Sequence, residues 1–170
     1  MLSAILLAAG RGVRLKSRLS KAVMRIKSKP VICYSLSVLD NHPAVDNIVI
    51  VANPGNIDRI SRIVTSYRFK KVGKIVLGGR ERKDSVLEGL KSLDPKTDYV
   101  LIHDAARIFI DRKIVTDCIS AAKRHKAAVA AVPVKPTIKI SGDGLWVRAT
   151  LRRENLWEAQ TPQVFEKELI

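Results

Sequence analysis

The sequence has few cysteines, few aromatic residues and few acidic residues, and it contains no long hydrophobic run. Two cysteines among 170 residues exclude a disulfide-stapled secreted fold and favour buried thiols in a reducing compartment. No apolar run approaches the roughly 20 residues that a membrane-spanning helix needs. No basic residue precedes the short apolar stretch at the N-terminus, so a secretory signal is not expected. We therefore expect a cytoplasmic protein without a membrane partner.

The shortage of acidic residues leaves a strongly basic chain, with 31 Lys and Arg against 16 Asp and Glu and a net charge of +15. Such a charge is typical of proteins that bind nucleic acids, because Lys and Arg neutralise phosphates. Here the basic residues are spread along the chain, with no aromatic-interleaved strand and no basic tail. We therefore expect a solvated basic surface around a phosphate-rich site, without a specific nucleic-acid partner.

Apolar strands and amphipathic helices alternate along the chain, and 46% apolar residues suffice for the core of one domain over residues 1–170. The expected strands are 4–7, 47–52, 74–77, 99–103 and 127–133, and the expected helices are 31–39, 56–67, 84–93 and 112–125. This alternation predicts an α/β fold, a mostly parallel sheet with helices on both faces and with ligands at the carboxyl ends of its strands.

One segment interrupts the alternation with two short runs, 137–140 and 145–150, joined by Ser-Gly-Asp-Gly. This pattern predicts a β-hairpin. A hairpin that projects from such a sheet exposes its edges, and a second subunit is the simplest cover.

The first strand runs into Ala8-Ala9-Gly10-Arg11-Gly12-Val13-Arg14, with Lys21 further on. The alanines leave room for a flat nucleobase, and Gly10 and Gly12 allow the backbone to approach phosphates closely. Arg14 and Lys21 are the cations that would neutralise a polyphosphate. The alternative is a plain strand-turn-helix without a ligand.

Two further segments follow expected strands. Gly78-Gly79 precede a helix in which Ser85 could reach a phosphate, although a glycine turn with Asp84 as helix N-cap is the alternative. After the strand 99–103, Asp104 could hold Mg²⁺ directly or through water, since this ion takes one or two carboxylates plus phosphates. We expect His103 to be a packed, hydrogen-bonded residue and Trp157 to lie in the core.

These motifs occur in the order seen in 2-C-methyl-D-erythritol 4-phosphate cytidylyltransferases, which the chain resembles from residue 1 to residue 170. The segments that carry the resemblance are 8–14 with Lys21, 78–79 with 84–86, 103–107, 132–134 with 137–139, and 156–157 with 161–163. The resemblance implies a Rossmann-like nucleotide-diphospho-sugar transferase fold, with a β-arm at about 137–151 that builds a homodimer. It also implies Mg²⁺-dependent transfer of CMP from CTP to the sugar-alcohol phosphate, with release of pyrophosphate.

The resemblance also implies roles for single residues. Arg14 and Lys21 would stabilise the triphosphate and the pentavalent phosphorus, and Asp104 would lie near the metal and the acceptor. The nucleotide cradle would consist of Ala8, Ala9, Gly10, Gly12, Gly79, Ser85 and Ala106. The sugar phosphate would be bound by Asp104, Arg107, Thr137, Arg153 and Thr161, in part across the dimer.

Two alternatives stay open at this point. A cytidylyltransferase for another polyol phosphate, such as ribitol 5-phosphate, differs only in its acceptor. Family members continue beyond the Thr161-Pro162-Gln163 segment, so we also expect the C-terminal end of the domain to be missing. The second alternative is therefore a truncated, non-catalytic module for nucleotide binding or dimerisation.

Overall fold

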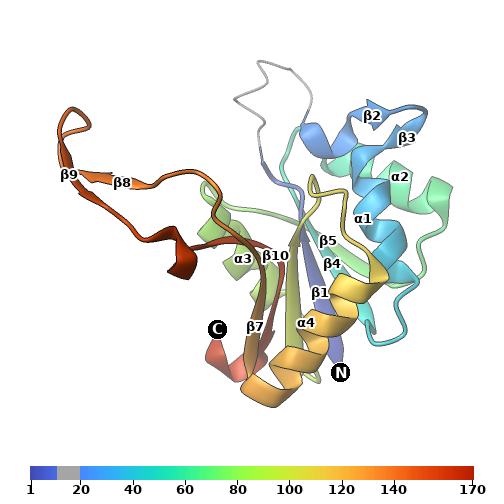
Figure 1. The fold of residues 1–170 in the computed structure, drawn as a ribbon. Coiled ribbons are helices and arrows are strands. Elements are labelled where there is room, and N and C mark those ends of the chain that lie inside the picture. The colour runs from blue at the N-terminus through green and yellow to red at the C-terminus, as the bar shows by residue number, and fades with distance from the viewer. Residues whose placement is uncertain (11–19) are drawn as a thin grey trace.

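The computed structural model describes residues 1–10 and 20–170, and its centre is a six-stranded sheet with the order β5-β4-β1-β6-β10-β7 (Figure 1). The strands of this sheet are β1 (Leu2–Leu7), β4 (Asn47–Ala52), β5 (Val72–Leu77), β6 (Tyr99–Asp104), β7 (Ala127–Pro133) and β10 (Trp157–Glu166). The helices are α1 (Val31–Asp40), α2 (Ile57–Tyr67), α3 (Arg82–Lys91) and α4 (Arg112–His125). Short elements are η2 (Lys21–Val23), β2 (Arg25–Ile26), β3 (Lys29–Pro30), β8 (Lys139–Ser141), β9 (Val147–Thr150), η3 (Arg153–Asn155) and η4 (Lys167–Leu169).

The sheet is mostly parallel, as the alternation of strands and helices predicts. Strands β5, β4, β1 and β6 pair in parallel, and β10 pairs antiparallel with both β6 and β7. Strand β10 was not expected, because its sequence contains a proline and mixes polar with apolar residues. It enters the sheet between β6 and β7, and its antiparallel register brings Gln163 and the residues just before it to the carboxyl end of β6.

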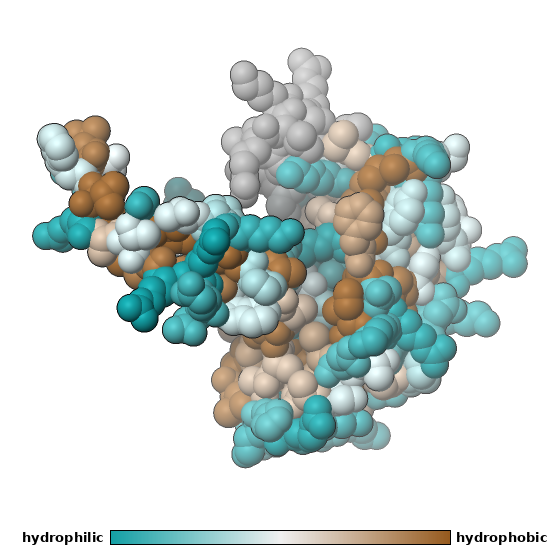
Figure 2. Space-filling view, viewed as in Figure 1, coloured by the Kyte–Doolittle hydropathy of each residue, from teal (hydrophilic) through white to brown (hydrophobic). Residues whose placement is uncertain are grey.

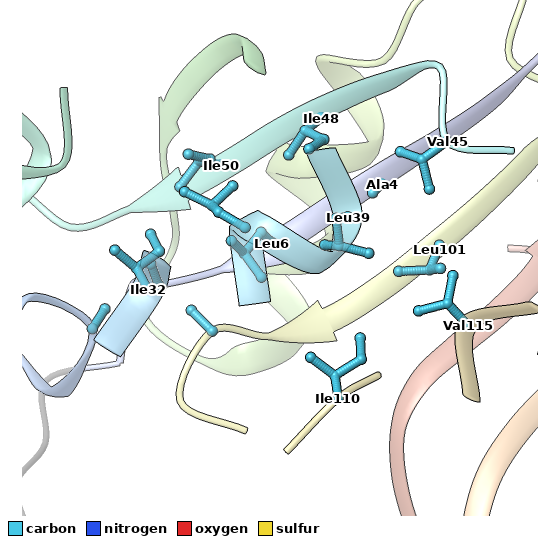
Figure 3. Packing of buried hydrophobic residues seen from close by; sticks show 14 of the residues in the cluster. Ala4, Leu6, Ile32, Leu39, Val45, Ile48, Ile50, Leu101, Ile110 and Val115 are labelled. Carbon is cyan, nitrogen blue, oxygen red and sulfur yellow. The ribbon is translucent and has the colours of Figure 1, made fainter. Parts of the chain in front are cut away.

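Both faces of the central strands are buried, as a parallel sheet between helices requires. Successive residues of β1 point to opposite faces, so Leu6 joins the core under α1, α2 and α4, while Ile5 joins the smaller core under α3. Figure 3 shows the larger core, in which Leu39 of α1 and Val115 of α4 lie around the strand residue Leu101. These two cores fix the strand ends that carry the candidate site.

Helix α3 begins two residues earlier than expected, and Asp84 is not its N-cap. Glu81 is the N-cap, and Asp84 at the third helical position accepts a hydrogen bond from the Glu81 N–H at 2.8 Å. This reciprocal capping box satisfies backbone donors at the start of the helix. Helix α4 has the bounds expected from its pattern, since the Asp111 side chain caps the Ile114 N–H at 2.7 Å.

The hairpin exists as the arm, which we define as residues 134–151, and it extends away from the sheet (Figure 1). Its strands β8 and β9 are shorter than expected, and Gly144 in the turn has a φ of +80°, which glycine tolerates. Leu145 and Trp146 at its far end are 83% and 76% exposed, where Figure 2 shows brown hydrophobic atoms.

Three further expectations can be compared with the described residues. Cys33 and Cys118 are buried free thiols, as expected, and burial raises the pKa of Cys33 to about 11. Trp157 is 62% exposed at the start of β10, so its placement in the core was wrong. Among residues 1–10 and 20–170, no helix combines the length and apolar character that crossing a membrane requires.

Candidate active site

Two asparagines from the segment between β4 and α2 donate hydrogen bonds to the backbone that follows β1. The Ala8 N–H donates to the Val51 carbonyl at 2.7 Å. The amide of Asn56 donates to the Ala8 carbonyl at 2.9 Å, and the amide of Asn53 donates to the Ala9 carbonyl at 3.0 Å. The sequence analysis missed both asparagines, although two amide side chains in a turn directly after a strand could have indicated them. They fix the backbone on which a ligand would lie.

The glycine turn is described only in part. Gly12 and Arg14 lie outside the described residues, so their expected roles are not placed. The Ser20 hydroxyl donates to the Gly10 carbonyl at 3.3 Å. Lys21, the next residue, opens η2 and is partly exposed. The chain therefore comes back to the end of β1 at Ser20, just before Lys21.

Gly78 and Gly79 are required by close packing. A Cβ atom on Gly78 would lie 2.6 Å from the Ser85 hydroxyl oxygen and 2.9 Å from the Ala9 Cβ. A Cβ atom on Gly79 would lie 2.2 Å from the Cβ of Asp84. The glycines thus bring the start of α3 against the end of β1. We call Ala8, Ala9, Gly10, Gly78, Gly79 and Ser85 the glycine cluster.

A second group gathers around Asp104 at the end of β6, and we call it the Asp104 cluster. The Asp104 carboxylate accepts a hydrogen bond from Arg107 Nε at 3.2 Å on one oxygen and from Arg82 Nε at 3.2 Å on the other. Arg82 also donates to the Gln163 side-chain oxygen at 3.4 Å, and Arg107 donates to Gln160. The cluster consists of Arg82, Asp104, Arg107, Gln160, Thr161 and Gln163. The sequence analysis missed Arg82 and both glutamines, because only the unexpected strand β10 brings 160–163 to this edge.

His103 is fully buried, as expected, and its ring hydrogen-bonds two residues of the Asp104 cluster. Its Nε2 lies 3.1 Å from the Arg107 carbonyl, which can only accept, so Nε2 carries the proton. Its Nδ1 therefore accepts from the Thr161 hydroxyl at 2.9 Å, and that hydroxyl oxygen accepts the Asp104 N–H at 3.3 Å. Burial lowers the pKa of His103 to about 4, and the hydrogen bond to Arg107 only partly opposes this shift.

The two clusters adjoin at one edge of the sheet. Leu7 on β1 is in register with Asp104 on β6, and the Ala105 N–H donates to the Leu7 carbonyl at 3.0 Å. Ala106 follows as an exposed residue. The backbone of Ala8 to Gly10 therefore leaves the sheet beside the carboxylate of Asp104.

Within one chain, the described structure does not place Thr137 and Arg153 beside the two clusters. Both lie near the base of the arm, and Arg153 donates to the Lys135 carbonyl at 3.1 Å. Figure 1 shows that the arm extends away from the sheet.

The described residues contain no group of three or more His, Cys, Asp or Glu side chains that could hold a metal ion by themselves. The carboxylate of Asp104 lies at the end of β6, and its side chain is 29% exposed. A single carboxylate fits Mg²⁺ that arrives with a polyphosphate, because this ion keeps waters and binds substrate oxygens as well. It does not fit a cation held by the protein alone.

Comparison with known proteins gives the family of the chain. The family model for 2-C-methyl-D-erythritol 4-phosphate cytidylyltransferase matches residues 2–170. The enzymes of that name from Clostridioides difficile and Alkaliphilus oremlandii are 43% and 40% identical to the chain, which spans 71% and 72% of their lengths. The alignments cover 100% and 99% of this chain.

A crystal structure of 4-diphosphocytidyl-2C-methyl-D-erythritol synthase from Anaerococcus prevotii superimposes with a TM-score of 0.84 at 32% identity. The match covers 99% of this chain and 70% of the other. Matches of sequence and structure over almost the whole chain leave one assignment. The chain belongs to the 2-C-methyl-D-erythritol 4-phosphate cytidylyltransferase family.

Proposed function

We propose that the chain transfers CMP from CTP to 2-C-methyl-D-erythritol 4-phosphate and releases pyrophosphate. The observation that carries the proposal is the register of Leu7 with Asp104, which sets a glycine-lined backbone beside a carboxylate flanked by two arginines. Membership of the family and its whole-chain structural match support the same reaction.

In this reaction a phosphate oxygen of the acceptor attacks the α-phosphorus of CTP. The new P–O bond forms as the bond from the α-phosphorus to the bridging oxygen breaks, and the electron pair leaves with pyrophosphate. The attacking oxygen is already anionic, so no strong base is needed. The task of the protein is to align two anions and to neutralise their charge.

The glycine cluster would bind the nucleotide. Its small residues leave the backbone accessible, and Ser85 lies against Gly78 in the first turn of α3, where its hydroxyl would bond a phosphate oxygen. Lys21 and Arg14 would meet the charge of the triphosphate and of the pentavalent phosphorus. Mg²⁺, bound by the phosphates and by Asp104, would supply further charge neutralisation.

The Asp104 cluster would bind the acceptor. The guanidinium of Arg107 matches phosphate oxygens in geometry and charge, and Thr161 offers a hydroxyl that His103 holds in place. Asp104 would orient a hydroxyl of the polyol or hold the metal.

Thr137 and Arg153 would complete the acceptor site of a partner molecule in a homodimer. Their place near the base of an arm that extends away from the sheet (Figure 1) favours this arrangement, as do the exposed apolar residues at the end of the arm. In this assignment the arm serves both assembly and substrate binding.

Pyrophosphate release in the presence of CTP, Mg²⁺ and a panel of acceptors tests the proposal. We expect turnover with 2-C-methyl-D-erythritol 4-phosphate to exceed turnover with ribitol 5-phosphate. The reverse order would assign the chain to another polyol phosphate, and CTP binding without any turnover would indicate a non-catalytic module.

The Lys21→Ala variant tests the chemical role within the same assay. Loss of a charge that acts in the transition state typically lowers kcat by about a hundredfold to a thousandfold. We expect that loss with CTP binding weakened far less. Equal losses in kcat/KM and in CTP affinity would mean that Lys21 only holds the ground state.

A further inference from the structure

Arg82 is the first residue of α3, and its side chain reaches across the site edge. Its Nε donates to Asp104 at the end of β6, and its Nη2 donates to Gln163 on β10. The side chain is 49% exposed, so it lies at the surface of the site. One guanidinium therefore connects three elements that are far apart in the sequence.

These three elements carry residues of both clusters. Helix α3 packs over β1, β4 and β5, and it carries Ser85 against Gly78. Asp104 and Gln163 lie on β6 and β10, on the other side of β1. Among the described residues, the hydrogen bonds of Arg82 are the side-chain link from α3 to the other members of the Asp104 cluster. A movement of α3 on nucleotide binding would reach Asp104 through this side chain.

Arg82 and Arg107 together fix the position of the Asp104 carboxylate. Arg82 bonds one carboxylate oxygen while Arg107 bonds the other, so the two guanidinium groups fix the carboxylate from opposite sides. A guanidinium presents several N–H groups in a rigid plane and can serve two acceptors at once, which a lysine ammonium does with less defined geometry. Removal of Arg82 would leave the carboxylate held on one side only.

We propose that Arg82 is a positioning residue that couples the nucleotide half of the site to its acceptor half. Nucleotide bound on the glycine cluster fixes the start of α3, and Arg82 then fixes Asp104 for the acceptor. This role rests on the proposed function. It predicts that each substrate strengthens binding of the other, and that the effect depends on Arg82.

The experiment compares wild type with Arg82→Ala, Arg82→Lys and the matched control Lys83→Ala. Lys83 is the neighbouring cation, and its only ion pair among the described residues is with the exposed Glu81. Calorimetry with the α,β-methylene analogue of CTP and Mg²⁺, with and without 2-C-methyl-D-erythritol 4-phosphate, measures the coupling without turnover. Steady-state assays give KM for each substrate and kcat.

We expect the acceptor to tighten binding of the analogue by on the order of tenfold in wild type and in Lys83→Ala. In Arg82→Ala this factor should fall toward one, and KM for the acceptor should rise about as much, while binding of the analogue alone changes by less than about twofold. Arg82→Lys should recover part of the coupling, because it keeps the charge and the long stem but not the fork.

The proposed role of Arg82 would be overturned if the coupling in Arg82→Ala equalled that in Lys83→Ala. It would also be overturned if Arg82→Ala weakened the binding of CTP alone. A wild-type chain without turnover would instead contradict the proposed function. If Arg82→Ala is less stable than wild type, the Arg82→Lys variant is the deciding comparison. Coupling in Arg82→Lys equal to that in wild type would exclude a role for the guanidinium geometry.

Discussion

At the scale of single residues, His103 shows how a buried group can support a site at the surface. It accepts from the Thr161 hydroxyl and donates to the Arg107 carbonyl, so two residues of the acceptor half depend on its neutral form. Burial is the main reason that its pKa falls to about 4, and the nearby charges of Asp104 and Arg107 act in opposite directions. The neutral ring is therefore part of the folded structure.

The stability of the chain should fall as the pH falls from about 6.5 to about 4. In this range the unfolded chain protonates His103, whereas the folded chain, with its lowered pKa, does not, so protonation favours unfolding. Above pH 6.5 the ring is neutral in both states, and this contribution is fully present. The pKa difference corresponds to about 3 kcal/mol of unfolding free energy, measurable by urea denaturation at several pH values.

The His103→Gln variant should lose this part of the pH dependence, because glutamine does not titrate. His42→Gln is the matched control, since burial also lowers the pKa of His42, which lies on another part of the fold. It should keep the slope that His103 causes. A His103→Gln curve parallel to wild type between pH 6.5 and 4 would contradict the assignment.

At the scale of elements, Gly89 sets how closely α3 approaches the sheet. A Cβ atom there would lie 2.7 Å from Ile5 Cγ2 and 3.2 Å from Val51 Cγ2. Alanine favours a helix over glycine by about 1 kcal/mol, but overpacking a core costs about 1–3 kcal/mol. Because β-branched Ile5 cannot easily turn away, we expect Gly89→Ala to destabilise the chain by about 1 kcal/mol in urea denaturation.

A double-mutant cycle with Ile5→Ala separates crowding from other effects of this substitution. Ile5→Ala alone should cost about 2–5 kcal/mol, because it leaves a cavity at a fully buried site. Gly89→Ala should then be neutral or stabilising, since its methyl group enters that cavity. Additive losses would show that the contact with Ile5 is not what limits position 89.

The elements that the sequence predicted are those whose signals are local. Helix α4 has the expected bounds because Asp111 caps it and apolar residues recur on one face. Strand β10 has no such signal, since its pairing with β6 and β7 comes from distant parts of the chain. For the same reason Gly78 and Gly79 could be recognised as part of the site, whereas the partners Arg82 and Gln163 could not.

The arm is the element that we expect to make the dimer. Leu145 and Trp146 at its end are largely exposed, and large apolar residues in such positions mark interaction surfaces. If the arm builds the dimer, replacing both with serine should raise the dimer dissociation constant by at least about thirtyfold in sedimentation experiments. Phe109→Ser is the control, because Phe109 is 91% exposed but lies outside the arm. A dimer that survives the double substitution would place the interface elsewhere.

At the scale of the whole molecule, charge and apolar surface oppose each other. The net charge of +15 repels copies of the chain from one another over distances that salt shortens. Strand β7 lies at the edge of the described sheet, and Val129 on it is 42% exposed. Among the described residues its outer side pairs with no strand, so its backbone groups can pair with another copy.

This balance predicts self-association that grows with salt. At 1 M salt charges are screened within about 3 Å, compared with about 10 Å at 0.1 M, so repulsion weakens while the apolar edge remains. Sedimentation should therefore show species larger than a dimer at high salt and fewer at low salt. A lysine at position 129 places a charge on the edge strand, and Val129→Lys should suppress the larger species without changing any dimer made by the arm. Larger species that decrease with salt, or that persist in Val129→Lys, would show that charge pairing or another surface, and not the β7 edge, drives the association.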